Sequence, residues 1–312
     1  MSKPIQHIPL PERFPENFGS PLKGLLSLIF DIHEFGNSHK IVLDYSNAAF
    51  TNPLYTLSLP LLVKMFERKG IEIILESEFK QPNVSSYMSL LQFPEGVCPE
   101  QIPNQGYEKY LEGYKHKTYI PILNFPTAEN EHTNKIRDNF LSAINSIITH
   151  QANLDSIMRS AIMYLIDEGI NNIIHHAQDE RGYILAQVYP SNGYMEICIA
   201  DIGRTLLQSY EQSGRHNEIH THLEAMSAAL NGRSTKSDNV DRGFGISTSK
   251  KMLTEGLNGK YFLFSGNVFN IHTSEINDIT ELPPEIFWQR AYLAMRIPLV
   301  AKAGFNPSSY YE

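Results

Sequence analysis

The stretch Glu168-Gly-Ile-Asn-Asn-Ile-Ile-His-His-Ala177 decides the fold that we expect for this chain. Glu168, Asn172 and His176 are spaced by four residues, so on a helix they lie along one stripe. A carboxylate beside an amide suits a magnesium-bound phosphate, because the amide oxygen ligates the ion and the carboxylate orients water. Gly169 costs a helix ~1 kcal/mol relative to alanine, which indicates a close approach by another segment. The alternative is a solvated polar face.

Further polar and glycine-containing segments follow along the chain. Asp201 comes at the end of an apolar strand, where a carboxylate can accept a hydrogen bond from the adenine amino group, and Gly203 lets the backbone approach a flat base. Gly243 and Gly245 precede a helical segment, so backbone amides there could face phosphates. The segment Ser234-Thr-Lys236 offers hydroxyls and a cation that could fold over a triphosphate. Each segment alone is equally compatible with an ordinary turn.

Taken in order, these segments resemble the signature of the GHKL, or Bergerat-fold, ATPases. Glu168-x-x-x-Asn172-x-x-x-His176-Ala177 is similar to the N-box of that family. Asp201-x-Gly203 resembles the first glycine box, and Arg242-Gly243-Phe244-Gly245-Ile246 resembles the second. Ser234-Thr235-Lys236 looks like the lid motif of some members. The four motifs occur in family order within residues 130–299.

This resemblance implies an α+β fold for residues 129–301, with helices on one face of a mixed, mostly antiparallel sheet. It also implies ATP and Mg2+ as cofactors. In that reading Asn172 ligates magnesium, Glu168 polarises the attacking water, and Asp201 binds adenine with Gly203 packed beneath it. The remaining cofactor-binding residues that the resemblance implies are Ser234, Thr235, Lys236, Gly243, Phe244, Gly245 and Ile246.

The N-terminal part shows a different pattern. The segment from Ile41-Val-Leu-Asp44 to Ile71-Glu-Ile-Ile-Leu75 reads as strand, turn, helix and strand, and it resembles, more weakly, a STAS domain of the anti-sigma antagonist type. The position where that family often carries a phosphorylated serine corresponds to Asn52, Pro53 and Leu54 here. We therefore expect an irregular segment 1–20, a STAS-like α/β domain 21–93, a proline-rich linker 94–128, the ATP-binding domain 129–301 and a tail 302–312.

Bulk composition limits the partners. The 312 residues carry a net charge of −8, so no basic footprint points to nucleic acid. No apolar run approaches the ~18 residues of a membrane span, so we expect no membrane partner. Cys98 and Cys198 are too few for a disulfide framework, and we expect a cytoplasmic protein.

The expected function is that of an ATP-binding regulatory protein, a magnesium-dependent switch with slow ATP hydrolysis in which Glu168 is the base. ATP would order the segment 204–241 and change contacts with the N-terminal domain, a protein partner or a second copy in a homodimer. One alternative is a serine/threonine protein kinase of the anti-sigma type that acts on a separate partner. Another is a non-catalytic interaction protein with a degenerate nucleotide site, which Thr205 and Asp241 favour because they stand where the family often has glycine.

Overall fold

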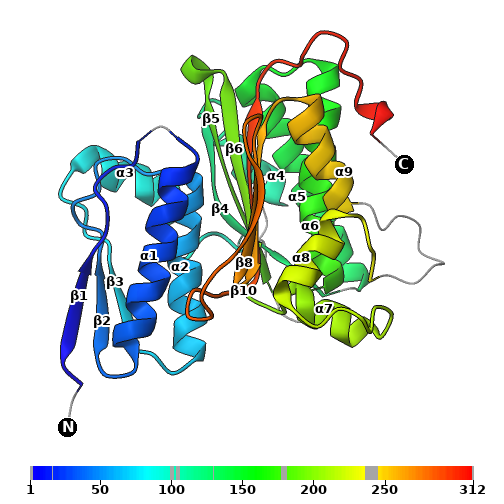
Figure 1. Ribbon diagram of the computed structural model, residues 1–312. Coiled ribbons are helices and arrows are strands. Elements are labelled where there is room, and N and C mark those ends of the chain that lie inside the picture. The colour runs from blue at the N-terminus through cyan, green and yellow to red at the C-terminus, as the bar shows by residue number, and fades with distance from the viewer. Residues whose placement is uncertain are drawn as a thin grey trace.

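The computed structural model describes residues 3–15, 17–98, 102, 106–128, 130–176, 181–235 and 245–310. These residues form an α+β protein with two sheets, one of three parallel strands and one of seven strands (Figure 1). The α+β class is therefore as expected.

The N-terminal unit is a three-stranded parallel sheet in the order β1-β2-β3. Its helix α2 begins at Pro53, where the missing proline N–H needs no partner, and the Asn52 side chain accepts a hydrogen bond from the backbone N–H of Tyr55. The elements are β1 (Ile5–Pro9), α1 (Gly19–Gly36), β2 (Lys40–Asp44), α2 (Pro53–Arg68), β3 (Ile73–Glu76) and α3 (Pro82–Leu90).

The seven-stranded sheet has the order β4-β5-β6-β10-β7-β8-β9. The pairings among these seven strands are all antiparallel, and an isolated bridge between Val97 and Leu123 of β4 is parallel; we expected a mixed, mostly antiparallel sheet. The strands are β4 (Tyr119–Pro126), β5 (Arg181–Tyr189), β6 (Tyr194–Asp201), β7 (Lys260–Gly266), β8 (Val268–His272), β9 (Asn277–Glu281) and β10 (Trp288–Pro298). A short 3-10 turn, η2 (Pro190–Asn192), connects β5 and β6.

Two segments expected to be irregular are strands. Residues 5–9 lie in the segment 1–20 but pair in parallel with β2. Residues 119–126 lie in the expected linker 94–128 but form β4, the edge strand that pairs with β5; α4 (Gly106–Glu112) precedes it. Pro121 falls at the register shift between Ile120 and Leu123, and proline is tolerated at such an irregularity because no ladder bond from its nitrogen is needed there.

Helices cover both faces of the large sheet (Figure 1). On one face lie α5 (Glu131–Ala152), α6 (Ser156–His176), α7 (Leu206–Ser213), α8 (His222–Leu230) and α9 (Gly245–Lys251), and α9 continues as the π-helical turn η3 (Met252–Gly256). After β10 comes a short 3-10 turn, η4 (Pro307–Ser309). Ile162, Ile166 and Ile170 of α6, four residues apart, are buried against the core.

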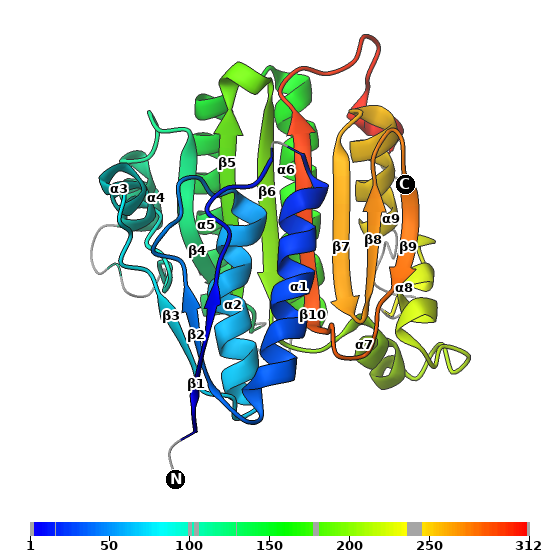
Figure 2. The same ribbon diagram turned by 60° about the vertical axis from the view of Figure 1, so that its left-hand side comes forward.

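The N-terminal unit covers the opposite face, with α1 and α2 lying across the central strands (Figure 2). One hydrophobic cluster runs through both sheets without interruption. The Tyr292 hydroxyl of β10 donates to the carbonyl of Leu54 at 2.7 Å, and Arg68 Nη1 of α2 donates to the carbonyl of Ile202 at 3.0 Å. The end of strand β6 is thus in direct contact with α2.

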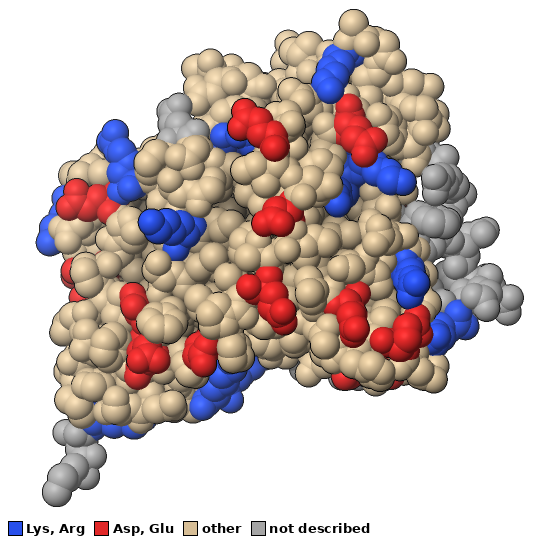
Figure 3. All heavy atoms as spheres, viewed as in Figure 1, with Lys and Arg blue, Asp and Glu red and all other residues tan. Residues whose placement is uncertain are grey.

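On the face shown in Figure 3, acidic and basic side chains are interspersed among uncharged ones. Within the described ranges, no helix combines the length and the apolar character that a membrane crossing requires.

Candidate functional site

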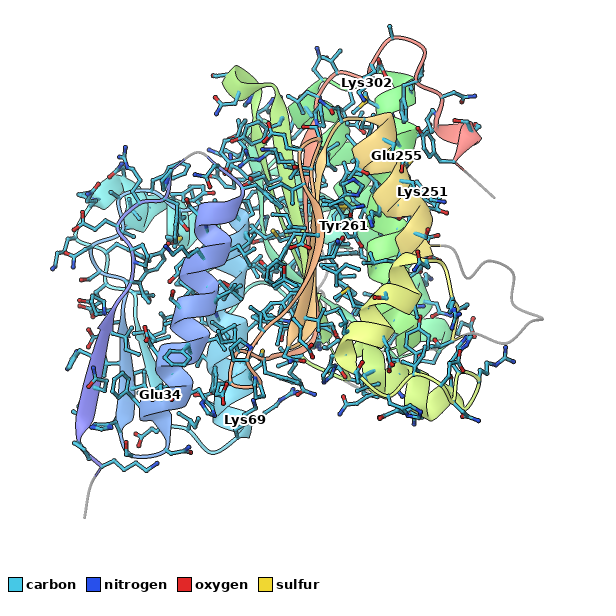
Figure 4. All side chains as sticks on the ribbon, viewed as in Figure 1. Glu34, Lys69, Lys251, Glu255, Tyr261 and Lys302 are labelled. Atoms are coloured by element: carbon cyan, nitrogen blue, oxygen red, sulfur yellow. The ribbon has the colours of Figure 1, made fainter. Side chains whose placement is uncertain are left out.

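A cavity lies between the large sheet and the helices α6, α7, α8 and α9. It contains about 990 Å3 of empty space, part of which opens to solvent. The apolar part of its sheet wall is formed by Ile199 of β6, Leu263 of β7 and Leu293 of β10. Tyr261 of β7 lies between the sheet and α9 (Figure 4), and burial raises the pKa of its hydroxyl, which therefore stays protonated at neutral pH.

Helices α6 and α9 meet at Glu168 and Gly245. A Cβ atom at Gly245 would overlap with Glu168 Oε2 and would lie 3.7 Å from Asn172 Nδ2. Only glycine at this position leaves the Glu168 carboxylate where it is. Both side chains line the cavity, one helical turn apart, as the spacing predicts.

Gly169 explains how α6 comes so close to the sheet. A Cβ atom there would lie 2.6 Å from Ile199 Cδ1 and 3.2 Å from Leu293 Cδ2. The close approach inferred from a glycine inside this helix is therefore present, and it sets the distance between α6 and the sheet wall of the cavity.

Ser234 and Thr235 line the cavity after α8, together with Ile246 of α9. Two contacts hold the backbone of this segment. The Tyr210 hydroxyl of α7 donates to the carbonyl of Arg233 at 2.6 Å, and the Nε2 atom of His216 lies 2.9 Å from the carbonyl oxygen of Ser234. Six of the residues expected to form the site thus share one cavity: Glu168, Asn172, Ser234, Thr235, Gly245 and Ile246. Lys236, Gly243 and Phe244 lie outside the described residues.

Asp201 and Gly203 are placed differently from the expectation. Asp201 is fully buried and does not line the cavity; its Oδ2 atom lies 2.6 Å from Nε of Arg290. Gly203 packs against the same arginine, because a Cβ atom there would lie 3.4 Å from Arg290 Cδ. The Arg290 side chain therefore occupies the space beside Asp201 that we expected an adenine to fill.

Thr205 has a structural role. It is the N-cap of α7, and its side chain accepts a hydrogen bond from the backbone N–H of Gln208, while the Gln208 side chain accepts from the backbone N–H of Thr205. A residue that departs from the resembled glycine pattern thus begins a helix of the cavity wall.

Sequence reasoning gave no role to several polar residues of the wall, among them Arg204, Arg233, Ser249 and Arg290. Ser249 is 5% exposed, and its hydroxyl has no hydrogen-bond partner among the described residues. A buried polar group without a partner is costly, which makes this hydroxyl a candidate contact for a ligand. Arg290 had a sequence signal, since a charge stands near the start of a mainly apolar strand.

Asp167 adjoins the site on α6. Burial and, to a lesser extent, the neighbouring Glu168 raise the pKa of this carboxyl to about 6. The proton on Asp167 is therefore held more tightly in the folded chain than in a flexible one, and the negative charge next to Glu168 is reduced below that pH.

The donor set fits a hard divalent cation bound together with phosphates. Glu168 and Asn172 supply a carboxylate and an amide oxygen, the ligand types that Mg2+ takes when water and phosphate complete its shell. Both side chains line the cavity, and the missing Cβ atom of Gly245 leaves room for the Glu168 carboxylate.

Comparison of the chain with protein-family models, with curated proteins and with solved structures gives no match.

Proposed function

We propose that the cavity binds ATP with Mg2+ and that the protein is an ATP-dependent regulatory switch. One observation carries this proposal: Glu168 and Asn172 of α6 meet Gly245 of α9 in the same cavity that Ser234 and Thr235 line. These segments are far apart in the sequence and were expected together on the basis of the motif order.

The chemistry of the wall supports a nucleotide. The apolar residues Ile199, Leu263 and Leu293 offer a surface for a flat base, and Arg204 and Arg233 bring positive charge for phosphates. Asn172 would hold Mg2+, which when bound neutralises part of the phosphate charge. Glu168 would accept the proton of a water molecule that attacks the terminal phosphorus, with ADP as the leaving group.

The contact between Arg68 and the Ile202 carbonyl supports a regulatory role. Ile202 stands between Asp201 and Gly203, at the end of the strand that forms part of the cavity wall, while Arg68 belongs to α2 of the N-terminal unit. A change at this strand end on nucleotide binding would be transmitted to α2, and from there to a second copy of the chain or to a protein partner.

Calorimetric titration tests the binding step. We expect MgATP to bind the wild-type protein and Asn172→Ala to weaken binding at least about tenfold, the value of one hydrogen bond or ligand contact to a charged group. The matched control is Asn171→Ala, the neighbouring asparagine on α6, which does not line the cavity. Equal affinity of the two variants, or no binding by the wild type, would contradict the proposal.

The ion pair of Asp201 with Arg290 favours a second candidate, an interaction protein in which the nucleotide is held but not hydrolysed. Because the Asp201 carboxylate is paired with Arg290, it does not by itself position an adenine base. MgATP binding without phosphate release over many hours, unchanged by Glu168→Gln, would select this candidate over the switch that hydrolyses ATP.

A further inference from the structure

The Asp201–Arg290 pair is a built feature of the sheet end. Arg290 is 3% exposed; its Nε atom lies 2.6 Å from Asp201 Oδ2, and its Nη2 donates to the carbonyls of Ile173 at 2.7 Å and Asn172 at 3.1 Å. One guanidinium thus connects β10, the end of β6 and the C-terminal part of α6. The two charge-assisted hydrogen bonds to the carbonyls hold the guanidinium in place, and the ion pair keeps the Asp201 carboxylate beside it.

The backbone at Arg290 is adapted to this role. Its φ angle is +77°, a region that residues other than glycine rarely adopt, and it lies where the pairing of β10 with β7 shifts register between Trp288 and Tyr292. Next to it, the Gln289 side chain donates to the carbonyl of Gly203 at 2.7 Å. Strained backbone persists where surrounding contacts determine it and often marks a functional position.

The pair changes what the cavity presents to a base. Arg290 and Ala291 line the cavity, whereas Asp201 does not. An amino group on a base is a donor and needs an acceptor, but the Asp201 carboxylate is turned to Arg290. The proposed function assigns Glu168, Asn172, Arg204 and Arg233 to the metal, the water and the phosphates. The remaining polar groups of the wall besides Arg290 are hydroxyls, among them that of Ser249, and a hydroxyl can donate to an oxo group as readily as it accepts from an amino group.

We propose that Arg290 is the specificity-determining residue of the cavity. By withdrawing Asp201 from the wall, it removes the group that would select adenine, so the cavity accepts purine nucleoside triphosphates with either an amino or an oxo group at position 6. This inference rests on the proposed nucleotide-binding function, and it adds the class of nucleotides that the site takes.

Competition between two nucleotides tests the inference. The Kd values of MgATP and MgGTP are measured by calorimetry for the wild type, Arg290→Lys, Arg290→Met and the double variant Arg290→Met with Asp201→Asn. We expect the wild-type values to agree within about fivefold, because no fixed acceptor or donor discriminates position 6. Arg290→Lys keeps a cation beside Asp201 and should leave the ratio unchanged.

In Arg290→Met the carboxylate becomes available, so the ratio should move toward ATP by about tenfold or more, and Asp201→Asn should cancel that shift. A wild-type preference for ATP above about 50-fold, or a ratio that Arg290→Met leaves unchanged, overturns the inference. If Arg290→Met does not fold, the ratio of the two Kd values in the wild type and in Arg290→Lys still tests the inference. If neither nucleotide binds the wild type, the proposed function is overturned together with the inference. If MgATP binds and MgGTP is strongly rejected, only the inference is overturned.

Discussion

Replacement of Gly245 by alanine tests the geometry at the centre of the site. The new Cβ atom would overlap with Glu168 Oε2, whereas the Asn172 amide, at 3.7 Å, would be in ordinary contact. The Glu168 carboxylate is the end of a flexible side chain, so it can retreat, and we expect the free energy of unfolding to fall by less than about 1 kcal/mol. The carboxylate would move by roughly 1 Å, and a displacement of that size in a catalytic group costs about 100-fold in rate.

The assay is phosphate release from MgATP, run beside thermal unfolding of the same samples. The matched control is Gly19→Ala: Gly19 is likewise the first residue of a helix, but a Cβ atom there meets only Asn17 Oδ1, at 3.8 Å. We expect the control to hydrolyse ATP at the wild-type rate and Gly245→Ala to lose most of the activity while staying folded. Wild-type turnover by Gly245→Ala would refute the argument that the position of Glu168 against Gly245 matters.

Three further predictions concern the surroundings of the site. Gly169→Ala gains about 1 kcal/mol of helix propensity but places a Cβ atom 2.6 Å from Ile199 Cδ1, and overpacking costs about 1–3 kcal/mol. We therefore expect urea unfolding to show a less stable variant. A more stable variant would contradict the close packing of α6 on the sheet. Because the pKa of Asp167 is raised from 3.8 to about 6, the folded chain binds the proton more tightly than the unfolded chain, and stability is lost as the pH rises through that interval. Asp167→Asn should therefore raise the Tm near neutral pH but not in acid below that interval. An equal rise in Tm at both pH values would show that titration of Asp167 does not cause the stabilisation. Arg68→Met removes the hydrogen bond to the Ile202 carbonyl and should lower the free energy of unfolding by about 1 kcal/mol while weakening MgATP binding, and unchanged affinity would argue against coupling through α2.

Local patterns were sufficient to predict the helix that carries the site. The apolar positions and the polar stripe of residues 154–176 repeat at helical spacing, and α6 covers Ser156–His176. The two strands Arg181–Tyr189 and Tyr194–Asp201 also follow from their alternation and from the turn between them. In each of these elements the residues that determine the structure are neighbours in the sequence.

Elements that depend on distant partners could not be predicted in this way. Two long helices separate β4 from its partner β5 in the sequence. The prolines of β4 favour a linker, and only the pairing with β5 shows that this segment is a strand at the sheet edge. The role of Arg290 depends on the register shift of β10 and on Asp201, which is far away in the sequence. Six residues of the cavity were named from the sequence, whereas the burial of Asp201 and the position of Arg290 were not predicted.

The most direct test of the central claim is a crystal structure with a non-hydrolysable ATP analogue and Mn2+ in place of Mg2+. The account predicts an anomalous manganese signal beside the Asn172 amide oxygen, with phosphates next to Gly245 and the base against the apolar sheet wall. The account is contradicted if the cavity shows no density at a saturating concentration of the analogue. It is also contradicted if the analogue binds at another surface with the metal far from Asn172.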